Sequence, residues 1–264
     1  MRGARAAIFA AALLASSCGA PLMKLPAGPG VPATDAGALL AQATAACSKV
    51  STLSAEVGVS GSVNGSRVRG RLLAGLASPD SLYMEAPAPF GSPVFVLGAA
   101  HGDATLLLPR DRRVLEHGRP DEVLGAITGV PLSPSDLRAT LTGCVADDHA
   151  ADGEASAIGS DWRIIGGEPV RYLRRERADG SWRLVSVVRR GSDGWRADYS
   201  NFSNDLPRRI RLIATQPRRF DLSLELSQVD INVDLEPSTF RVTVPSGMQA
   251  ISIDELRAGG PLSR

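Results

Sequence analysis

The sequence contains few of the residues and motifs that enzyme active sites and metal sites require. Its three histidines, His101, His117 and His149, each lie near an expected turn or loop. None of them has the metal-ligand spacing to a cysteine or a carboxylate. A G-x-S-x-G elbow, a P-loop and a dinucleotide-binding glycine fingerprint are also absent from the sequence. We therefore expect a protein that is not an enzyme, binds no metal and needs no cofactor.

The chain also lacks a strong excess of charge and a long apolar run. Its formal net charge is +1 over 264 residues, which gives no electrostatic reason to bind nucleic acid. The apolar run at 6–15 is shorter than the ~20 residues that a membrane-spanning helix needs. Arg2 and Arg5 before the run, and small residues after it, are the layout of a secretory signal peptide. We expect residues 1–17 to be this signal peptide.

Cysteine is also scarce, and each of the three cysteines can be assigned a role. Cys18 directly follows small residues at the expected cleavage site, as in a bacterial lipobox. It then becomes the first mature residue and carries the acyl chains of a lipid anchor. An ordinary signal peptide with an incidental cysteine is the alternative. Cys47 and Cys144 remain as an even pair in an oxidising compartment, which favours a disulfide over two buried thiols.

The segment after the anchor differs in composition from the rest of the chain. Residues 18–34 include four prolines and few apolar side chains that a fold would bury. We expect a tether there, which allows a domain to stand clear of a bilayer. The remaining residues, 35–264, have the length of a single all-β domain.

From residue 53 onward, apolar and polar side chains alternate with the period of β-strands. Strands are expected at 53–60, 68–76, 81–86, 94–99, 104–108, 113–116, 162–165, 170–177, 182–190, 195–202, 209–214, 220–228 and 240–244. Asn64-Gly65 predicts a tight hairpin, and a change of phase at 226–229 indicates a bulge or a break. Helices are expected at 35–50, 120–128, 134–143 and 252–257. This order predicts a mainly β fold, a large curved antiparallel sheet with short helices.

Three features of residues 81–143 resemble the LolB type of outer-membrane lipoprotein receptor. A strand, L-Y-M-E at 82–85, runs into P-F-G at 89–91 and is followed by another strand. L-G-A-I-T-G-V-P-L at 124–132 and S-D-L-R-A-T-L-T-G at 135–143 resemble two helices of that family. The C-terminal sequences V-D-I-N at 229–232 and F-R-V-T-V-P at 240–245 are more similar to the closing strands of LolA.

The resemblance implies a half-open β-barrel whose short helices form a lid over an apolar cavity. It implies acylated lipoproteins or lipids as cargo, a location at the periplasmic side of the bacterial outer membrane, and a periplasmic carrier as a further partner. The family's P-L-G corner carries an apolar residue that protrudes into solvent and assists handover, and Phe90 occupies that position. Gly19, directly after the anchor, is compatible with outer-membrane residence, since inner-membrane retention in the best-known system uses Asp there.

The residues expected to line the cavity lie on the strands and on the two lid helices. They are Leu72, Leu76, Leu82, Met84, Val94, Val96 and Leu106 on strands, and Leu124, Ile127, Leu137 and Leu141 on helices. The alternative is an ordinary filled core, which periodicity by itself does not distinguish from a cavity. Phe90 has the same two interpretations, either an exposed handover residue or a side chain that packs inward.

Two further questions stay open at this level. Arginines on outer strand faces, such as Arg67, Arg69 and Arg71, indicate either solvation and protection of a sheet edge or a surface for a partner. The leading function is a carrier or receptor that binds acyl chains and assists localisation of lipoproteins. The alternatives are an envelope sensor or interaction lipoprotein that binds a protein partner, and a structural assembly subunit.

Overall fold

The computed structural model describes residues 22–144, 154–176, 178–192, 194–214 and 219–259. The expected signal peptide, the anchor Cys18 and His149 lie outside these residues. The helices are α1 Ala36–Thr44, α2 Pro120–Thr128, α3 Pro134–Thr142 and α4 Ile253–Ala258, with short 3-10 turns η1 Cys47–Lys49 and η3 Pro237–Phe240. No helix of the described ranges is long and apolar enough to cross a membrane.

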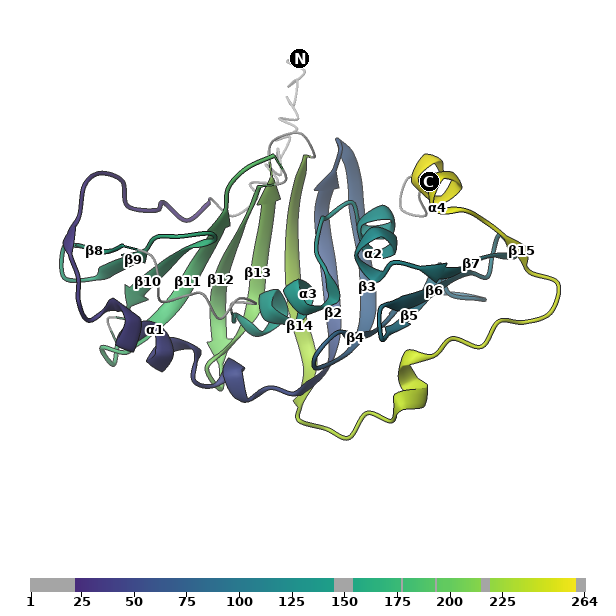
Figure 1. The fold of residues 1–264 in the computed structure, drawn as a ribbon, viewed down its shortest axis with the longest axis horizontal. Helices are drawn as coiled ribbons and strands as arrows, with labels where there is room; N and C mark the ends of the chain where they lie inside the picture. Colours follow the sequence, from purple (N-terminus) through teal and green to yellow (C-terminus); the bar gives the residue numbers. More distant parts are fainter. Residues whose placement is uncertain (1–21, 145–153, 177, 193, 215–218, 260–264) are drawn as a thin grey trace, which may run out of the picture.

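The strands form a single open sheet (Figure 1). They are β1 Val31–Pro32, β2 Thr52–Val63, β3 Ser66–Ala77, β4 Ser81–Ala86, β5 Phe95–Ala100, β6 Asp103–Leu108, β7 Arg113–Gly118, β8 Ala155–Ile158, β9 Trp162–Ile165, β10 Val170–Arg175, β11 Trp182–Arg189, β12 Trp195–Ser203, β13 Leu206–Ala214, β14 Phe220–Ile231 and β15 Gln249–Ala250. Their order is β1-β8-β9-β10-β11-β12-β13-β14-β2-β3-β4-β5-β6-β7-β15. The sheet does not close, because β1 and β15 form its two edges. The mainly β fold expected from the sequence is thus confirmed.

Local sequence signals account for several of these elements. Asn64 and Gly65 both have positive φ angles, 49° and 84°, as a two-residue type I′ hairpin requires, and they join β2 to β3. Strands β4 and β9 and helix α2 have the predicted bounds. The predicted irregularity at 226–229 is confirmed, because the register between β14 and β2 shifts between Ser227 and Asp230.

The structure corrects three expectations near the chain ends. Residues 240–244 form no strand: Phe240 ends η3, and an irregular segment follows. This part of the chain packs over Gly98, where an added Cβ would lie 2.6 Å from the carbonyl oxygen of Phe240. The end of the expected tether is not free, since Val31–Pro32 pairs with β8, a short strand that the pattern missed. The sheet is also not wholly antiparallel, because β15 pairs with β7 in parallel.

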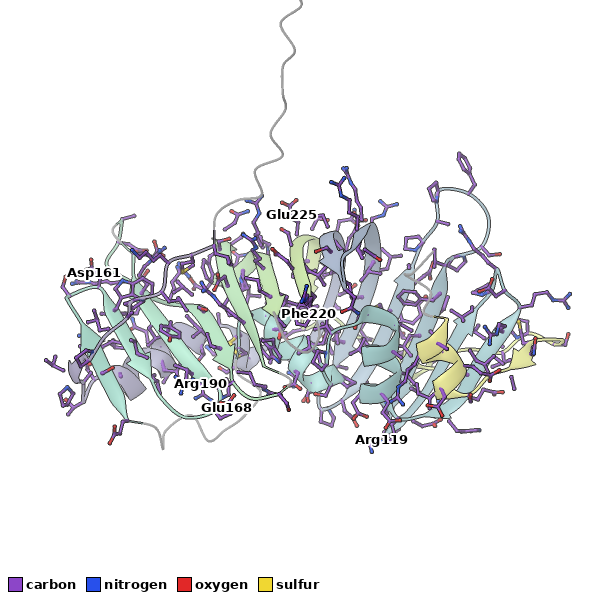
Figure 2. All side chains as sticks on the ribbon, turned by 90° about the horizontal axis from the view of Figure 1, so that it is seen from above. Arg119, Asp161, Glu168, Arg190, Phe220 and Glu225 are labelled. Atoms are coloured by element: carbon purple, nitrogen blue, oxygen red, sulfur yellow. A yellow bond between two sulfur atoms is a disulfide. The ribbon has the colours of Figure 1, made fainter. Side chains whose placement is uncertain are left out.

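The helices lie on one face of the sheet, which we call the inner face (Figure 1). Helix α1 contacts β8 to β11, whereas α2 and α3 lie in front of the central strands. Figure 2 shows how alternate positions on one strand differ: Phe220 of β14 points toward the helices and Glu225 points to the opposite, outer face. The buried core therefore consists of the inner-face side chains and the undersides of the helices.

The C-terminal segment passes around the β7 edge of the sheet. After β14, η3 contacts β4 and β5, β15 adds to β7, and α4 then packs against α2 (Figure 1). This route places the last described helix beside the helices of the inner face.

Candidate functional site

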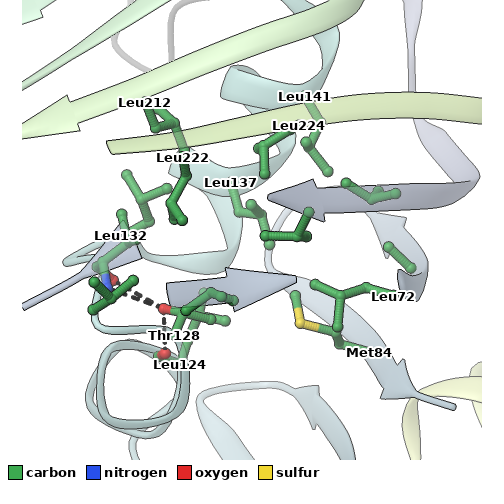
Figure 3. A pocket seen from close by; sticks show the side chains of 16 residues that line it. Leu72, Met84, Leu124, Thr128, Leu132, Leu137, Leu141, Leu212, Leu222 and Leu224 are labelled. Atoms are coloured by element: carbon green, nitrogen blue, oxygen red, sulfur yellow. Dashed lines mark hydrogen bonds between the residues drawn. The ribbon is translucent and has the colours of Figure 1, made fainter. Parts of the chain in front are cut away.

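An apolar pocket lies between the inner face of the sheet and the helices α2 and α3 (Figure 3). Its walls consist of 16 side chains from five strands, both helices and the segment between the helices. They are Val57, Val59, Val63, Val68, Leu72, Ala74, Met84, Leu124, Thr128, Val130, Leu132, Leu137, Leu141, Leu212, Leu222 and Leu224. The cavity between them has a volume of about 80 Å³. The pocket is therefore narrow.

Strand alternation explains why these side chains meet in one place. Every second residue of a strand points to the same face, so Val57, Val59 and Val63 of β2 all point inward. The register pairs Val59 with Leu224 of β14 and Val57 with Leu72 of β3. Three neighbouring strands thus form a continuous apolar floor.

Among the described side chains of the wall, the one polar side chain is Thr128, at the end of α2. Its hydroxyl donates to the carbonyl oxygen of Leu124 at 2.7 Å and accepts from the N–H of Val130 at 3.1 Å (Figure 3). Because the hydroxyl is satisfied within the protein, it offers little to a polar ligand. The wall is therefore suited to an apolar ligand.

Helix α3 is fixed at both of its ends. At its start, the Ser133 hydroxyl accepts from the N–H of Asp136 at 3.1 Å, and the Asp136 carboxylate accepts from the N–H of Ser133 at 3.3 Å, which is a capping box. After its last residue, Gly143 takes a left-handed φ of 71°. The next residue, Cys144, forms a disulfide with Cys47 of η1, with an S–S distance of 2.05 Å. This bond agrees with the pairing expected from the sequence.

Side-chain contacts also connect α3 to the body of the protein. The Arg138 guanidinium donates to the carbonyl oxygen of Val50 at 3.2 Å. Arg189 of β11 lies 3.5 Å from the Asp136 carboxylate. Helix α3 therefore has a covalent bond and two charged contacts to parts of the chain outside the lid.

Helix α2 is held differently, by contacts with α3, α4 and β6. Arg257 of α4 lies 4.0 Å from Glu122 of α2, and Glu255 of α4 lies 3.9 Å from Arg113 of β7. Both pairs are exposed enough to contribute little. The helix ends at Gly129, where an added Cβ would lie 2.5 Å from a methyl carbon of Val63, so the end of α2 touches β2 closely.

The pocket is open above Gly70. This residue lies between Val68 and Leu72, which both line the pocket, and its inner face has no heavy atom within 4 Å of an added Cβ. We call this place the mouth. A polar cleft adjoins the pocket at Leu132, with Asp121, Glu122, Asp136 and Arg257 among its lining residues. The apolar pocket and the polar cleft thus share Leu132 as a lining residue.

The structure places five of the eleven expected cavity residues in the pocket wall. These are Leu72, Met84, Leu124, Leu137 and Leu141. Four others, Leu76, Leu82, Leu106 and Ile127, are 0–1% exposed and fill the core.

Val94 and Val96 do not line the pocket. The expectation that their side chains point toward the inner face is wrong. The inward positions of β5 are Phe95 and Leu97, because Leu97 pairs with the inward-facing Met84 of β4. Val96 then points to the outer face.

Sequence reasoning missed the contribution of the distant strands β13 and β14. Leu222 and Leu224 alternate with polar residues, which signals a strand with one buried face. That signal does not say which part of the buried face lies next to the cavity. Val130 and Leu132, between the helices, were likewise missed because a connecting segment carries no period.

Phe90 lies in the connection between β4 and β5 and is 91% exposed. The inward-packed alternative for Phe90 is therefore wrong. The adjacent Gly91 has a φ of 75°, which favours glycine and turns the chain at this corner. The Phe90 ring therefore takes no part in the core.

No protein-family profile and no curated protein sequence matches this chain. A LolA superfamily protein from Nitrosomonas europaea has a similar structure, with a TM-score of 0.52 and 12% identity, covering 80% of this chain and 99% of that protein. Two further structures are less similar. A DUF1329 family protein from Desulfovibrio piger has a TM-score of 0.45 and 11% identity, covering 82% of this chain and 100% of that protein. The lipoprotein LppX from Mycobacterium tuberculosis has a TM-score of 0.33 and 11% identity, covering 76% of this chain and 99% of that protein. The first similarity shows that this chain has the fold of a LolA superfamily protein.

Proposed function

We propose that this protein is a lipid-anchored envelope protein that binds acyl chains of lipoproteins or lipids in the pocket and assists their localisation at the outer membrane. It carries no catalytic role in this proposal. The observation that supports it most is the pocket wall, in which Thr128, the only polar side chain among the described lining residues, is satisfied within the protein. A wall of this kind recognises a ligand by the removal of apolar surface from water.

The size of the hydrophobic effect makes the proposal quantitative. Each buried methylene contributes about 0.8 kcal/mol, so about five methylenes contribute roughly 4 kcal/mol. The cavity, with a volume of about 80 Å³, accommodates only part of an acyl chain. We therefore propose that helix α2 separates further from the sheet when a full chain enters.

The other parts of the molecule fit this proposal. Cys18 anchors the protein to the membrane, and the tether is the segment before Met23, whose carbonyl oxygen accepts a hydrogen bond from Arg196 of β12. Phe90, at 91% exposure, contacts a membrane or a carrier protein during handover. The polar cleft beside Leu132 receives the polar end of an acylated ligand.

A plug at the mouth tests acyl binding. Gly70→Phe adds a ring over the pocket, where the backbone has room for a side chain. We expect affinity for a fluorescently labelled palmitoyl peptide to fall at least about tenfold, which is ~1.4 kcal/mol. Ser60→Phe, on the outer face of the neighbouring strand β2, is the matched control and should leave affinity unchanged. Absence of binding by the wild type, or equal binding by Gly70→Phe, would contradict the proposal.

Handover is tested separately at Phe90. Phe90→Glu should fold normally, because the side chain has almost no buried surface to lose. It should bind the palmitoyl peptide with wild-type affinity but transfer an acylated lipoprotein to outer-membrane vesicles several-fold more slowly. Normal transfer by Phe90→Glu would rule out this role and leave acyl binding intact.

A further inference from the structure

Strand β3 has a long stretch of edge that no other strand covers. Strand β2 pairs with all of β3, from Ser66 to Ala77, but β4 pairs only with Leu73–Ala77. Beyond Ala86, the chain leaves β4 through Pro87 and Pro89 and does not continue the ladder. Within the described ranges, no strand pairs with the β4 side of residues 66–72. We call these residues the open edge.

The hairpin geometry determines which backbone groups face outward there. In a two-residue hairpin the pair that closes the turn, Val63 and Ser66, exchanges hydrogen bonds, and bonding then alternates along the ladder. Val68 and Gly70 therefore bond to β2. The N–H and C=O groups of Arg67, Arg69 and Arg71 point away from β2, toward the open edge.

The same three residues place positive charge on the outer face. Arg67, Arg69 and Arg71 lie opposite Ser62, Ser60 and Gly58 of β2, none of which is charged. Arg71 lies 3.4 Å from Glu56, whereas no ion pair or side-chain hydrogen bond involves Arg67 or Arg69 within the part of the chain that the structure describes. The three side chains repeat about every 6.8 Å, the spacing of alternate residues in a strand.

We propose that the open edge is a docking site for an extended acidic polypeptide segment, which adds to the sheet as a strand beside β3. The main chain of the segment bonds to the outward N–H and C=O groups of Arg67, Arg69 and Arg71. Its acidic side chains, at every second position, meet the arginine side chains on the outer face. This site goes beyond acyl binding, and neither proposal depends on the other.

Charge and position favour a polypeptide over the other partners. Charged side chains also protect edges, but they repel only segments of like charge, and residues 66–72, a regular part of a 12-residue strand, attract an acidic one. The intervening residues of a docked strand would project over the mouth, between Val68 and Leu72. A segment attached to an acyl chain would therefore have its lipid close to the pocket.

The first experiment uses an unacylated peptide, so that its outcome is independent of the pocket. The probe is a synthetic peptide of about ten residues with alternating glutamate and threonine, and lysine in place of glutamate gives the control peptide. Hydrogen exchange followed by NMR should show at least tenfold slower exchange for the amides of Arg67, Arg69 and Arg71 with the acidic peptide. The already bonded amides of Val68 and Gly70 should change much less. Unchanged exchange at the three arginines would overturn the proposal.

The second experiment blocks the edge without disturbing the hairpin. Arg69→Pro removes one outward N–H but no hydrogen bond to β2, and circular dichroism checks that the variant folds. Affinity for the acidic peptide should fall about tenfold or more. Arg69→Gln keeps the N–H and should lose only a few-fold. Wild-type affinity in Arg69→Pro would overturn the proposal.

Two other occupants give results that contradict the proposal. If the arginines served a membrane, phosphatidylglycerol vesicles would bind equally to Arg69→Gln and to Arg69→Pro, which lack the same charge, and the peptide would not bind. If a second copy of this chain occupied the edge, sedimentation would show a dimer that Arg69→Pro converts to a monomer.

Discussion

The two helices that cover the pocket are held to the protein in different ways. Helix α3 is bound covalently, since Cys144 directly follows it and is joined to Cys47, and Arg138 connects it to the backbone at Val50. Helix α2 depends on packing, and its charged contact to α4, between Glu122 and Arg257, spans 4.0 Å on an exposed surface. Of the two helices over the pocket, α3 is thus fixed covalently, whereas α2 is held only by non-covalent contacts.

This difference indicates how a narrow pocket admits an acyl chain. A disulfide prevents a large displacement of the end of α3, whereas α2 can separate from the sheet if α4 moves with it. The mouth at Gly70 lies on β3, and β3 contacts the fixed helix α3. Widening of the pocket therefore requires movement of the other helix, α2. We therefore expect α2 and α4 to open as a unit while α3 stays in place.

The largest expected effect is the loss of the disulfide. The bond closes a loop with a sequence separation of 97 residues, and the chain-entropy estimate for such a loop is about 4–5 kcal/mol. The double variant Cys47→Ser/Cys144→Ser should lose roughly 4 kcal/mol of unfolding free energy in a urea titration. Its α3 should also show faster amide exchange. A loss below about 1 kcal/mol would mean that α3 is fixed mainly by packing.

The second effect distinguishes the filled core from the hollow. Leu76 is 0% exposed and surrounded by packed atoms, so Leu76→Ala should cost about 3 kcal/mol. Leu222 borders the pocket and already lacks neighbours on one side, so Leu222→Ala should cost about 1–2 kcal/mol. Urea titrations of both variants give the comparison. Equal costs would indicate that the pocket is as well packed as the core.

The third effect concerns helix α2, which is held only by non-covalent contacts. Leu256 of α4 is 2% exposed, and Leu256→Ala should cost about 2 kcal/mol. Because α4 packs on α2, the same change should speed the entry of a palmitoyl probe several-fold in stopped-flow fluorescence. The control is Leu76→Ala, which destabilises the protein at a position on strand β3. An unchanged entry rate in Leu256→Ala would show that α2 opens without α4.

The smallest effect is expected at α1, which covers a filled part of the sheet. Hydrogen bonds from Arg163, at 2.9 Å, lower the pKa of Asp35 at the start of this helix. A lowered folded-state pKa gives stability that is present above the unfolded value of about 3.9 and is lost as pH falls through the folded value. Asp35→Asn should therefore be slightly less stable than the wild type at neutral pH. The difference between their urea midpoints should disappear in strong acid, and a constant difference would contradict the linkage.

The parts of the fold that were predictable from the sequence depend on local signals. Strand β4 alternates cleanly, Pro120 marks the start of α2, and Asn64-Gly65 admits one kind of turn. Phe90 was predictable as exposed because prolines and a glycine surround it. The composition of the pocket was not, since it depends on pairing between distant strands. Leu224 reaches the pocket only because β14 pairs with β2 across more than 150 residues of sequence.

The error at β5 has a similar cause. Residues 94–97 are all apolar. Alternation of apolar and polar residues therefore does not show which of them point toward the inner face. The register with Met84 of β4 chooses Phe95 and Leu97 as the inward pair. In a continuously apolar strand, only the pairing with a neighbouring strand shows which side chains are buried.

The most direct test of the account is to locate a bound acyl chain by NMR. With ¹³C-labelled palmitate as probe, short-range Overhauser contacts should appear to the methyl groups of Leu132 and Leu222, which line the pocket. No contacts should appear to Leu82 or Leu106, which lie in the filled core. Contacts confined to Phe90 and other surface residues, or none at all, would contradict the claim that the pocket is the binding site.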